Sequence, residues 1–428
     1  MNFYCPSQKI KIMRKRFHMN QMELEDTKMT RAFISMMESG KRKVSRASSK
    51  LLAQKFNIKA KELGLELGLD DEYFSRKPYE DAKIYCENEL LNENDYEQLE
   101  ELLNIALEFK LDYTSAKVYI KEGDRYFSEQ GYNTAFINYV NALGKLKELK
   151  ENREQSYVYN KIGLCKINIK EYEESVFYFN QAINYANEEN DEISFAEAAY
   201  NLALAYSYME NHIKSVEILD KSILSSSIFE KIDFNFKMNI KVLKAKEIYN
   251  SGKKEKAVEE YISLIKELQD KNDVILSNVY SLLGDYYFEI SNLHESLKYI
   301  NNAQRLKGKL DKGSLPNTLK TKAKIFFKQG LSDESIMILE LAMNISEELN
   351  DFNMLIAIYN ELIKIYKEIK DADRIIEMSN NLIEILDKNN FEKGKDIALC
   401  NLMEVAINQG DSEQTNEILS KLNILLGK

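Results

Sequence analysis

One arrangement of small and bulky residues recurs along most of this 428-residue chain and limits the folds open to it. In the clearest copies a glycine is followed by a small residue at +12, a bulky residue at +16 and an alanine at +19. These copies begin at Gly123, Gly163 and Gly284, and the frame begins again at Ala203 and Ala323, and more loosely at Ala245, Ile363 and Met403. Successive starts lie 39 to 42 residues apart, which predicts a repeat protein.

Each repeat is expected to be a pair of helices. A small residue in the first helix lets the second helix approach closely, and the bulky residue of the second helix fills the gap. Because one pair cannot bury its own apolar face, the pairs must stack. The pattern resembles a long form of the tetratricopeptide repeat (TPR) over roughly residues 115–425, with a degenerate copy over residues 80–109. The resemblance implies a right-handed superhelix of about eight to nine helix pairs, whose first helices line a concave groove.

The composition favours an all-α fold. With only 3 prolines and 15 glycines, and with little β-branched alternation, few positions would break a helix or favour a strand. We find no signal peptide and no apolar run long enough to span a bilayer, so we expect a cytoplasmic protein without membrane contact. The cysteines and histidines lack metal-ligand spacing, and no phosphate loop or nucleophile elbow is present. We therefore expect no metal, no cofactor and no enzymatic activity.

Charge is divided unevenly along the chain. Residues 1–60 contain 14 Lys and Arg against 4 Asp and Glu, a formal charge of +10. The chain as a whole has 59 basic and 69 acidic residues, so the remainder carries −20. A basic N-terminal part on an acidic body is typical of a protein that binds duplex DNA.

Within the basic part, residues 20–43 have the pattern of a helix-turn-helix. A short helix is expected to open at Gln21 and to turn Met22 and Leu24 inward. The Thr30 hydroxyl can cap the next helix, and Gly40 can end it. Helical spacing predicts a buried stripe on that second helix at Phe33, Ile34 and Met37.

The second helix of this motif would be the one that enters DNA. A major groove admits one helix, and the first turns of that helix reach base edges. Arg31 is the best candidate for a bidentate contact to guanine, while Thr30 and Ser35 could touch bases or phosphates. The candidate DNA-binding residues are Gln21, Lys28, Thr30, Arg31, Ala32, Ser35, Lys41, Arg42 and Lys43.

About the first 58 residues resemble the Cro/repressor-type helix-turn-helix. The matching residues are Gln21, Leu24, Ile34, Ser35, Glu38 and Gly40, followed downstream by Leu51-Leu52-Ala53 and Phe56-Asn57-Ile58. Glu25 stands where that family has a small residue, and the turn is one residue shorter than its commonest form. A three-helix packing unit without DNA contacts stays open as the alternative. We expect the DNA-binding domain over 1–58, a linker with a short bent helix over 59–78, and a peptide-binding and dimerisation domain of TPR repeats over 79–428.

Positions three before, one after and four after the small residue of each repeat should face the groove. An asparagine amide there can pair with the N–H and C=O of an extended peptide, and neighbouring pockets set specificity. The candidate peptide-binding residues are Asn160, Leu164, Tyr200, Asn201, Leu204, Ser207, Lys246, Tyr249, Asp285 and Asn360. The same rule places Ser281, Phe288, Lys320, Lys324 and Lys364 at the groove.

A helix-turn-helix joined to long-form TPR repeats resembles the RRNPP family of quorum-sensing receptors. The pairs Tyr159-Asn160, Tyr200-Asn201 and Tyr359-Asn360 look like that family's peptide-backbone clamps, and the length is nearer its NprR-like than its PlcR-like members. The resemblance implies a homodimeric transcriptional regulator that binds double-stranded DNA and a short signalling oligopeptide. It also implies control of sporulation, virulence or toxin production. Two alternatives stay open: an adaptor for a response regulator, as in the Rap branch, and a scaffold with a vestigial N-terminal domain.

Overall fold

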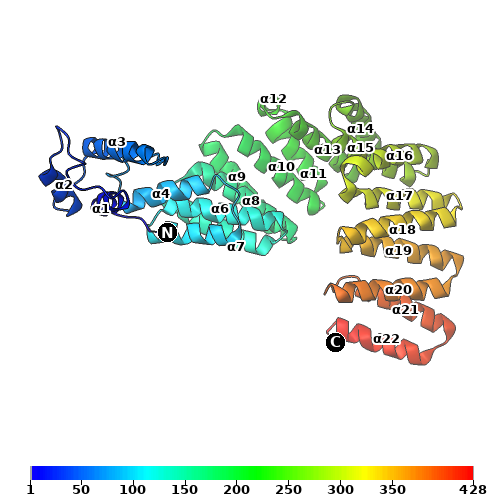
Figure 1. The fold of residues 1–428 in the computed structure, drawn as a ribbon. Coiled ribbons are helices and arrows are strands. Elements are labelled where there is room, and N and C mark those ends of the chain that lie inside the picture. The colour runs from blue at the N-terminus through cyan, green and yellow to red at the C-terminus, as the bar shows by residue number, and fades with distance from the viewer. Residues whose placement is uncertain (1, 428) are drawn as a thin grey trace. The chain divides into compact units, whose positions relative to one another are not determined.

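The computed structural model describes residues 2–427, and Figure 1 shows these residues as a succession of helices. Within them no β-strand forms, and one isolated bridge joins Asp26 and Met29. The predicted all-α fold is therefore confirmed. The helices fall into two compact units, of which the first ends at Glu210 and the second begins at Asn211.

The first unit contains the basic N-terminal domain and the first repeats. We call the three N-terminal helices the head: α1 (Pro6–Arg16), α2 (Arg31–Glu38) and α3 (Arg46–Glu62). The repeats continue as α4 (Pro78–Glu89), α5 (Tyr96–Glu108), α6 (Asp112–Ser128), α7 (Tyr132–Leu149), α8 (Asn152–Asn168), α9 (Tyr172–Glu188) and α10 (Glu192–Tyr208). The predicted degenerate copy at 80–109 corresponds to α4 and α5.

The second unit contains the remaining repeats, and α17 to α22 form successive layers in Figure 1. Its first helices are α11 (His212–Ile218), η1 (Leu219–Leu224), α12 (Ile228–Lys231), α13 (Phe234–Asn250), α14 (Lys254–Leu268), α15 (Asp273–Glu289) and α16 (Leu293–Leu310). They are followed by η2 (Lys312–Ser314), α17 (Leu315–Lys328), α18 (Ser332–Glu348), α19 (Phe352–Ile369), α20 (Ala372–Lys388), α21 (Lys395–Gln409) and α22 (Ser412–Leu425).

The small residues of the repeat lie where two helices come closest. A Cβ atom on Gly163 would stand 2.5 Å from the ring of Phe179, and one on Gly123 would stand 2.7 Å from the ring of Tyr139. Both distances are far below van der Waals contact, so only glycine fits these positions. All eight predicted repeat starts fall inside the first helix of a pair, which confirms the TPR-type architecture.

The repeat is irregular at one place, where successive starts are 42 residues apart instead of 39 or 40. There α11 is only seven residues long and continues as a π-helical turn, Leu219–Leu224. The short helix α12 follows before the next repeat begins. The additional residues are thus absorbed in the second helix of this repeat and in the connection after it.

The head is built around one apolar core to which α1, α2 and α3 all contribute. Ile10, Ile34 and Phe56 are completely buried in it. Thr30 caps α2 as predicted, since its hydroxyl accepts the Phe33 N–H at 3.4 Å. Gly40 follows α2 with a positive φ of 72°, in agreement with its predicted role.

The helix expected to open at Gln21 does not form, and residues 21–24 make a turn. The Asn20 side chain accepts the N–H groups of Met22 and Glu23 at 2.8 and 3.1 Å. These local bonds compete with helical ones and fix a turn instead. Leu24 still reaches the core with no exposed surface, whereas Met22, which was also expected to turn inward, is 60% exposed. The prediction of a helix that opens at Gln21 was therefore wrong, although Leu24 was correctly expected to lie in the core.

The segment after α3 packs against the head. No helix forms within residues 63–77, so the expected short bent helix is absent, and α3 itself continues to Glu62. Phe74 is fully buried, with its ring centroid 5.2 Å from that of Phe56. The Asn57 amide donates to the Leu69 carbonyl at 2.8 Å and accepts the Leu69 N–H at 3.0 Å. This segment is consequently fixed to the head at two points.

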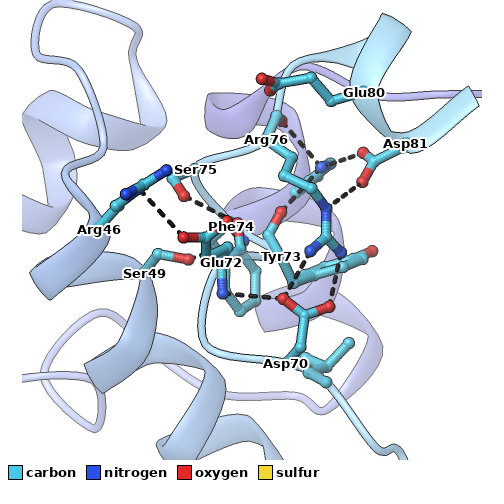
Figure 2. A network of polar contacts seen from close by, with 12 residues as sticks. Arg46, Ser49, Asp70, Glu72, Tyr73, Phe74, Ser75, Arg76, Glu80 and Asp81 are labelled. Carbon is cyan, nitrogen blue, oxygen red and sulfur yellow. Dashed lines mark hydrogen bonds and ion pairs between the residues drawn. The ribbon is translucent and has the colours of Figure 1, made fainter. Parts of the chain in front are cut away.

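A polar network, which we call the junction, connects the head to α4 through Lys9, Asp70, Arg76 and Asp81. Lys9 of α1 is 3% exposed, donates to the carbonyl oxygens of Tyr73 and Arg76 at 2.8 and 3.0 Å, and pairs with Asp81 of α4. Figure 2 shows the Arg76 guanidinium between two carboxylates, at 2.6 Å from Asp70 and 2.9 Å from Asp81. Burial lowers the pKa of the Lys9 ammonium.

Candidate DNA-binding face and peptide-binding groove

One face of helix α2 packs in the core of the head, and the opposite face is exposed. Ile34 and Met37 are completely buried, whereas Arg31, Ala32 and Ser35 are exposed. The separation follows from helical periodicity, because the buried pair lies on one side of the helix and the exposed residues on the other. The residues predicted to read base edges therefore lie on the accessible side of α2.

The N-terminus of α2 already holds a carboxylate of this chain. Glu25 accepts the Arg31 N–H through its side chain, and its own carbonyl oxygen accepts the Lys55 ammonium. A helix N-terminus favours negative charge, so Glu25 stabilises α2. It also adds negative charge to a face that would approach DNA phosphates.

The other candidate DNA contacts surround α2. Lys28, Thr30, Lys41, Arg42 and Lys43 are exposed. The Arg42 guanidinium lies 4.1 Å from the ring centroid of Phe33, which holds it beside α2. Gln21 is half-buried and donates to Glu38 at 2.8 Å, and Arg14 also pairs with Glu38, at 2.7 Å. The Gln21 amide is thus directed at its own chain, and its contact with a phosphate stays a prediction.

In the first unit the structure brings two predicted asparagines together. The Asn201 amide of α10 donates to the Asn160 side-chain oxygen of α8 at 2.9 Å. Neither amide makes another hydrogen bond within residues 2–427, so the Asn160 amino group and the Asn201 side-chain oxygen remain for a ligand. Reversing both amides would leave the same complement. Leu164, Tyr200, Leu204 and Ser207 are half-buried on the same two helices.

The tyrosines of the three Tyr-Asn pairs do not behave alike. Tyr159 is 5% exposed and stacks on Tyr185 in the core, and Tyr359 is 2% exposed. Neither ring is accessible to a peptide, so the expectation that these two tyrosines clamp a ligand was wrong. The physical reason is packing, since each precedes its asparagine and falls on the core side of its helix. Tyr200 is half-buried and keeps part of its surface open.

The predicted groove residues of the second unit differ in their surroundings. Lys246 is exposed, and the Tyr249 hydroxyl donates to Glu289. Asp285 reaches solvent and accepts the Thr321 hydroxyl at 2.8 Å, although the surrounding protein removes enough hydration to raise its pKa. The Asn360 side-chain oxygen is buried and has no hydrogen-bond partner within residues 2–427, and a buried unpaired acceptor is costly.

Ser281 does not face the groove, contrary to the prediction. It is 8% exposed and shares hydrogen bonds with the buried Lys307 and with Thr318, at 2.9 and 3.3 Å. Its position three residues before Gly284 was expected to face the groove. The hydroxyl is instead used to satisfy a buried ammonium between α15, α16 and α17.

A pocket of about 460 Å³ opens on the first helices of three successive repeats. Phe288 of α15, Phe327 of α17 and Ile365 of α19 line it, and Leu339 of α18 lies at its apolar floor. We call it the α17 pocket. Its volume lies within the range of roughly 300–1,000 Å³ typical of ligand pockets.

Charged side chains surround the apolar part of the α17 pocket. Lys324 pairs with Glu361 at 2.8 Å, and Lys328 stands 4.3 Å from the ring centroid of Phe288. The remaining charged residues of the lining are Lys364 and Glu368.

The groove rule identified part of this lining and missed the rest. It named Phe288, Lys324 and Lys364. Phe327 lies four residues after Ala323, a position that the rule includes, so its signal was present in the sequence. Glu361 and Ile365 lie two residues on either side of the repeat position and carried no such signal.

Comparisons with known proteins agree with this architecture. A tetratricopeptide repeat family model matches residues 156–189 and 196–227. The chain is 25% identical over 205 residues to response regulator aspartate phosphatase E of Bacillus subtilis strain 168, across 46% of this chain and 53% of that protein. It thus spans about half the length of this curated relative.

Two solved structures share the fold at low sequence identity. The apo form of the quorum sensor NprR from B. thuringiensis aligns with a TM-score of 0.54 at 16% identity, over 81% of this chain and 98% of that one. Aspartyl phosphate phosphatase F from Bacillus subtilis aligns with a TM-score of 0.53 at 14% identity, over 96% and 95%. The chain therefore has the helical-repeat fold of these regulators.

Two negative findings complete the description. Among residues 2–427, no helix is both long and apolar enough to cross a membrane. In the same part of the chain, no cluster of three or more His, Cys, Asp or Glu side chains is arranged to hold a metal ion.

Proposed function

We propose that this chain is a cytoplasmic, homodimeric transcriptional regulator that reads DNA with α2 and is controlled by a signalling oligopeptide bound to its repeats. The observation that carries the proposal is the open face of α2. Arg31, Ala32 and Ser35 are exposed on a helix whose opposite side is fully buried, within a stretch of charge +10. This combination gives a base-reading helix and phosphate-binding lysines.

Three features support a peptide as the controlling ligand. The Asn160–Asn201 pair leaves the Asn160 amino group and the Asn201 oxygen unused, which suits the C=O and N–H of an extended backbone. Asn360 is half-buried on α19, at the same repeat position as Asn160 on α8. The fold is also that of the quorum sensor NprR.

The proposed mechanism is a shift between two conformations of the repeats. A dimer reads two half-sites about 34 Å apart, so a small rotation of the subunits would change the match to DNA. The peptide must bind one conformation better than the other to produce this shift. The junction would transmit it, because Lys9 and Asp81 fix α1 to α4 without a flexible connection. Regulation of sporulation, virulence or toxin genes belongs to this proposal through the family resemblance.

A second candidate is an adaptor that holds a response regulator. The identity of 25% to response regulator aspartate phosphatase E is the observation that favours it. In that case the repeats would bind a protein, and the basic head would have no sequence-specific role.

Titration of the full chain onto its own promoter DNA at two salt concentrations tests the first candidate. Arg31→Ala should weaken binding about 5- to 150-fold, because a bidentate base contact contributes about 1–3 kcal/mol. Arg153→Ala is the matched control, since Arg153 is an exposed arginine of α8. Wild-type affinity should fall steeply with salt. Weak binding that ignores both DNA sequence and Arg31 would instead favour the adaptor, and a pull-down with response regulators would follow.

A further inference from the structure

Helix α17 has an unusual charge for the acidic body to which it belongs. Between Leu315 and Lys328 it carries four lysines and no Asp or Glu. The part of the chain after residue 60 has a formal charge of −20, so this helix is locally opposite in sign.

Three of these lysines, Lys320, Lys324 and Lys328, follow one another at intervals of four and share one face of the helix. Like charges at this spacing destabilise a helix. Lys324 is neutralised by Glu361. Lys320 and Lys328 have no carboxylate partner within residues 2–427.

Lys320 is the most constrained of the three. It is half-buried, and burial lowers the pKa of its ammonium. Lys364 adds a second exposed ammonium from α19, at the same repeat position as Lys324, and has no ion-pair partner in the described chain. The pocket lining contains two carboxylates. Glu361 pairs with Lys324, and Glu368 does not. The open charges at this surface are therefore mainly positive.

Lys324, Lys328 and Lys364 line the α17 pocket together with its apolar side chains. Phe288, Phe327 and Ile365 provide walls, and Leu339, which is 1% exposed, closes the floor. An apolar side chain of a ligand would be stabilised by leaving water and entering it. The charged rim would then meet whatever group follows that side chain along the ligand.

We propose that the α17 pocket binds an apolar side chain of an oligopeptide together with a neighbouring carboxylate, so that this chain selects acidic peptides. The inference rests on the proposed peptide-binding function and narrows the ligand class. The carboxylate can belong to an Asp or Glu side chain or to the peptide C-terminus, since both offer the same chemistry to Lys328 and Lys364.

Three pools of synthetic heptapeptides test the proposal against the full-length protein. Every peptide contains one Phe or Leu among neutral residues. The acidic pool has Asp or Glu beside it and an amidated C-terminus. The neutral pool has Asn or Gln instead and is also amidated, and the terminal pool is the neutral pool with a free C-terminal carboxylate. Retained peptides are counted by affinity selection and mass spectrometry.

The acidic or the terminal pool should be retained at least about tenfold over the neutral pool, and whichever is retained identifies the source of the carboxylate. Lys328→Gln and Lys364→Gln should remove that preference. Lys322→Gln is the matched control, because Lys322 lies on α17 and donates to Gln304 of α16, outside the pocket lining.

Two results would overturn the proposal in different ways. Equal retention of all three pools, or a preference that survives both pocket variants, contradicts carboxylate selection and leaves peptide binding intact. Retention of none of the pools contradicts the proposed peptide-binding function itself. Circular dichroism of each variant confirms that a lost preference does not come from unfolding.

Discussion

The repeats and the head are both helical, yet they are held together by different kinds of contact. A repeat pair is fixed by apolar shape, as where Gly163 leaves room for the Phe179 ring. The head is fixed to the first repeat by a buried ion pair between Lys9 and Asp81, supported by Arg76. The repeats use close packing between neighbours in sequence. The connection between the head and the repeats adds charge between distant segments to the apolar contact of Phe3 with Tyr85 and Phe109.

This difference has consequences for both stability and signalling. Apolar contacts tolerate small shifts of the helices, and the same kind of contact recurs in many repeats. Weakening one of them should therefore change the stability of the other repeats little. A buried ion pair has a narrow range of acceptable geometry, and removal of one partner leaves the other charge without compensation. The junction is therefore the place where a single change should separate the head from the repeats.

Asp81→Ala should have the largest effect. Removing this carboxylate leaves the Lys9 ammonium buried with only backbone carbonyls, at a cost of about 3–5 kcal/mol. Hydrogen exchange measured along the chain should show lost protection in α1 and α4 and unchanged protection in α17 to α22. Glu87→Ala is the control on the same helix, because Glu87 forms an exposed pair with Lys83 at 3.9 Å and should cost at most about 0.5 kcal/mol. Equal effects of the two variants would show that the junction does not hold the head.

Gly163→Ala should come second. The added methyl would stand 2.5 Å from the Phe179 ring and force α8 and α9 apart, which costs about 1–3 kcal/mol. Gly144→Ala is the control, since nothing lies within 4 Å of its Cβ position on α7, and it should stabilise by about 0.5–1 kcal/mol. Chemical denaturation of both variants measures the difference. If both variants changed the free energy of unfolding in the same direction, close packing would not be the reason for the glycines of the repeat.

The same contrast explains what could be predicted from the sequence. Contacts such as Gly123 with Tyr139 lie 16 residues apart and recur, so their spacing disclosed the helix pairs and the repeat starts. The junction could not be found in this way. Lys9 meets carbonyl groups 64 and 67 residues away, and such contacts leave no period.

The candidate sites show the same limit on a smaller scale. The exposed face of α2 followed from helical spacing, and so did Phe288 and Lys324 in the α17 pocket. The burial of Tyr159 did not, because the rule for groove positions does not say which neighbour of an asparagine faces the core. The turn at residues 21–24 depends on the Asn20 side chain, which overrides an otherwise helical pattern.

Glu25→Gln tests whether the Glu25 carboxylate weakens DNA binding while it stabilises α2. Loss of the carboxylate from the N-terminus of α2 should weaken the helix by at most about 1 kcal/mol. It should also raise affinity for promoter DNA about two- to fivefold, because repulsion of phosphates is removed. Fluorescence anisotropy at low salt measures the affinity. Glu62→Gln, at the C-terminal end of α3, is the matched control. An unchanged or lower affinity would place the N-terminus of α2 away from the DNA backbone.

Tyr113→Phe tests polar contacts between successive repeats. The Tyr113 hydroxyl of α6 donates to Glu154 of α8 at 2.7 Å, and this bond raises the pKa of Tyr113 to about 12. Removing it should cost about 0.5–1.5 kcal/mol near neutral pH.

The pH dependence of this difference distinguishes the bond from simple packing. Because the folded-state pKa of Tyr113 lies above its ordinary value of about 10, the stabilisation is complete below pH 10 and is lost as the pH rises towards 12. The stability gap between wild type and Tyr113→Phe should therefore shrink over that interval, as measured by denaturation at pH 8 and pH 11. If the stability difference stays constant with pH, the ring of Tyr113, and not its hydroxyl, supports the packing of α6 on α8. Polar contacts would then matter at the junction and not between repeats.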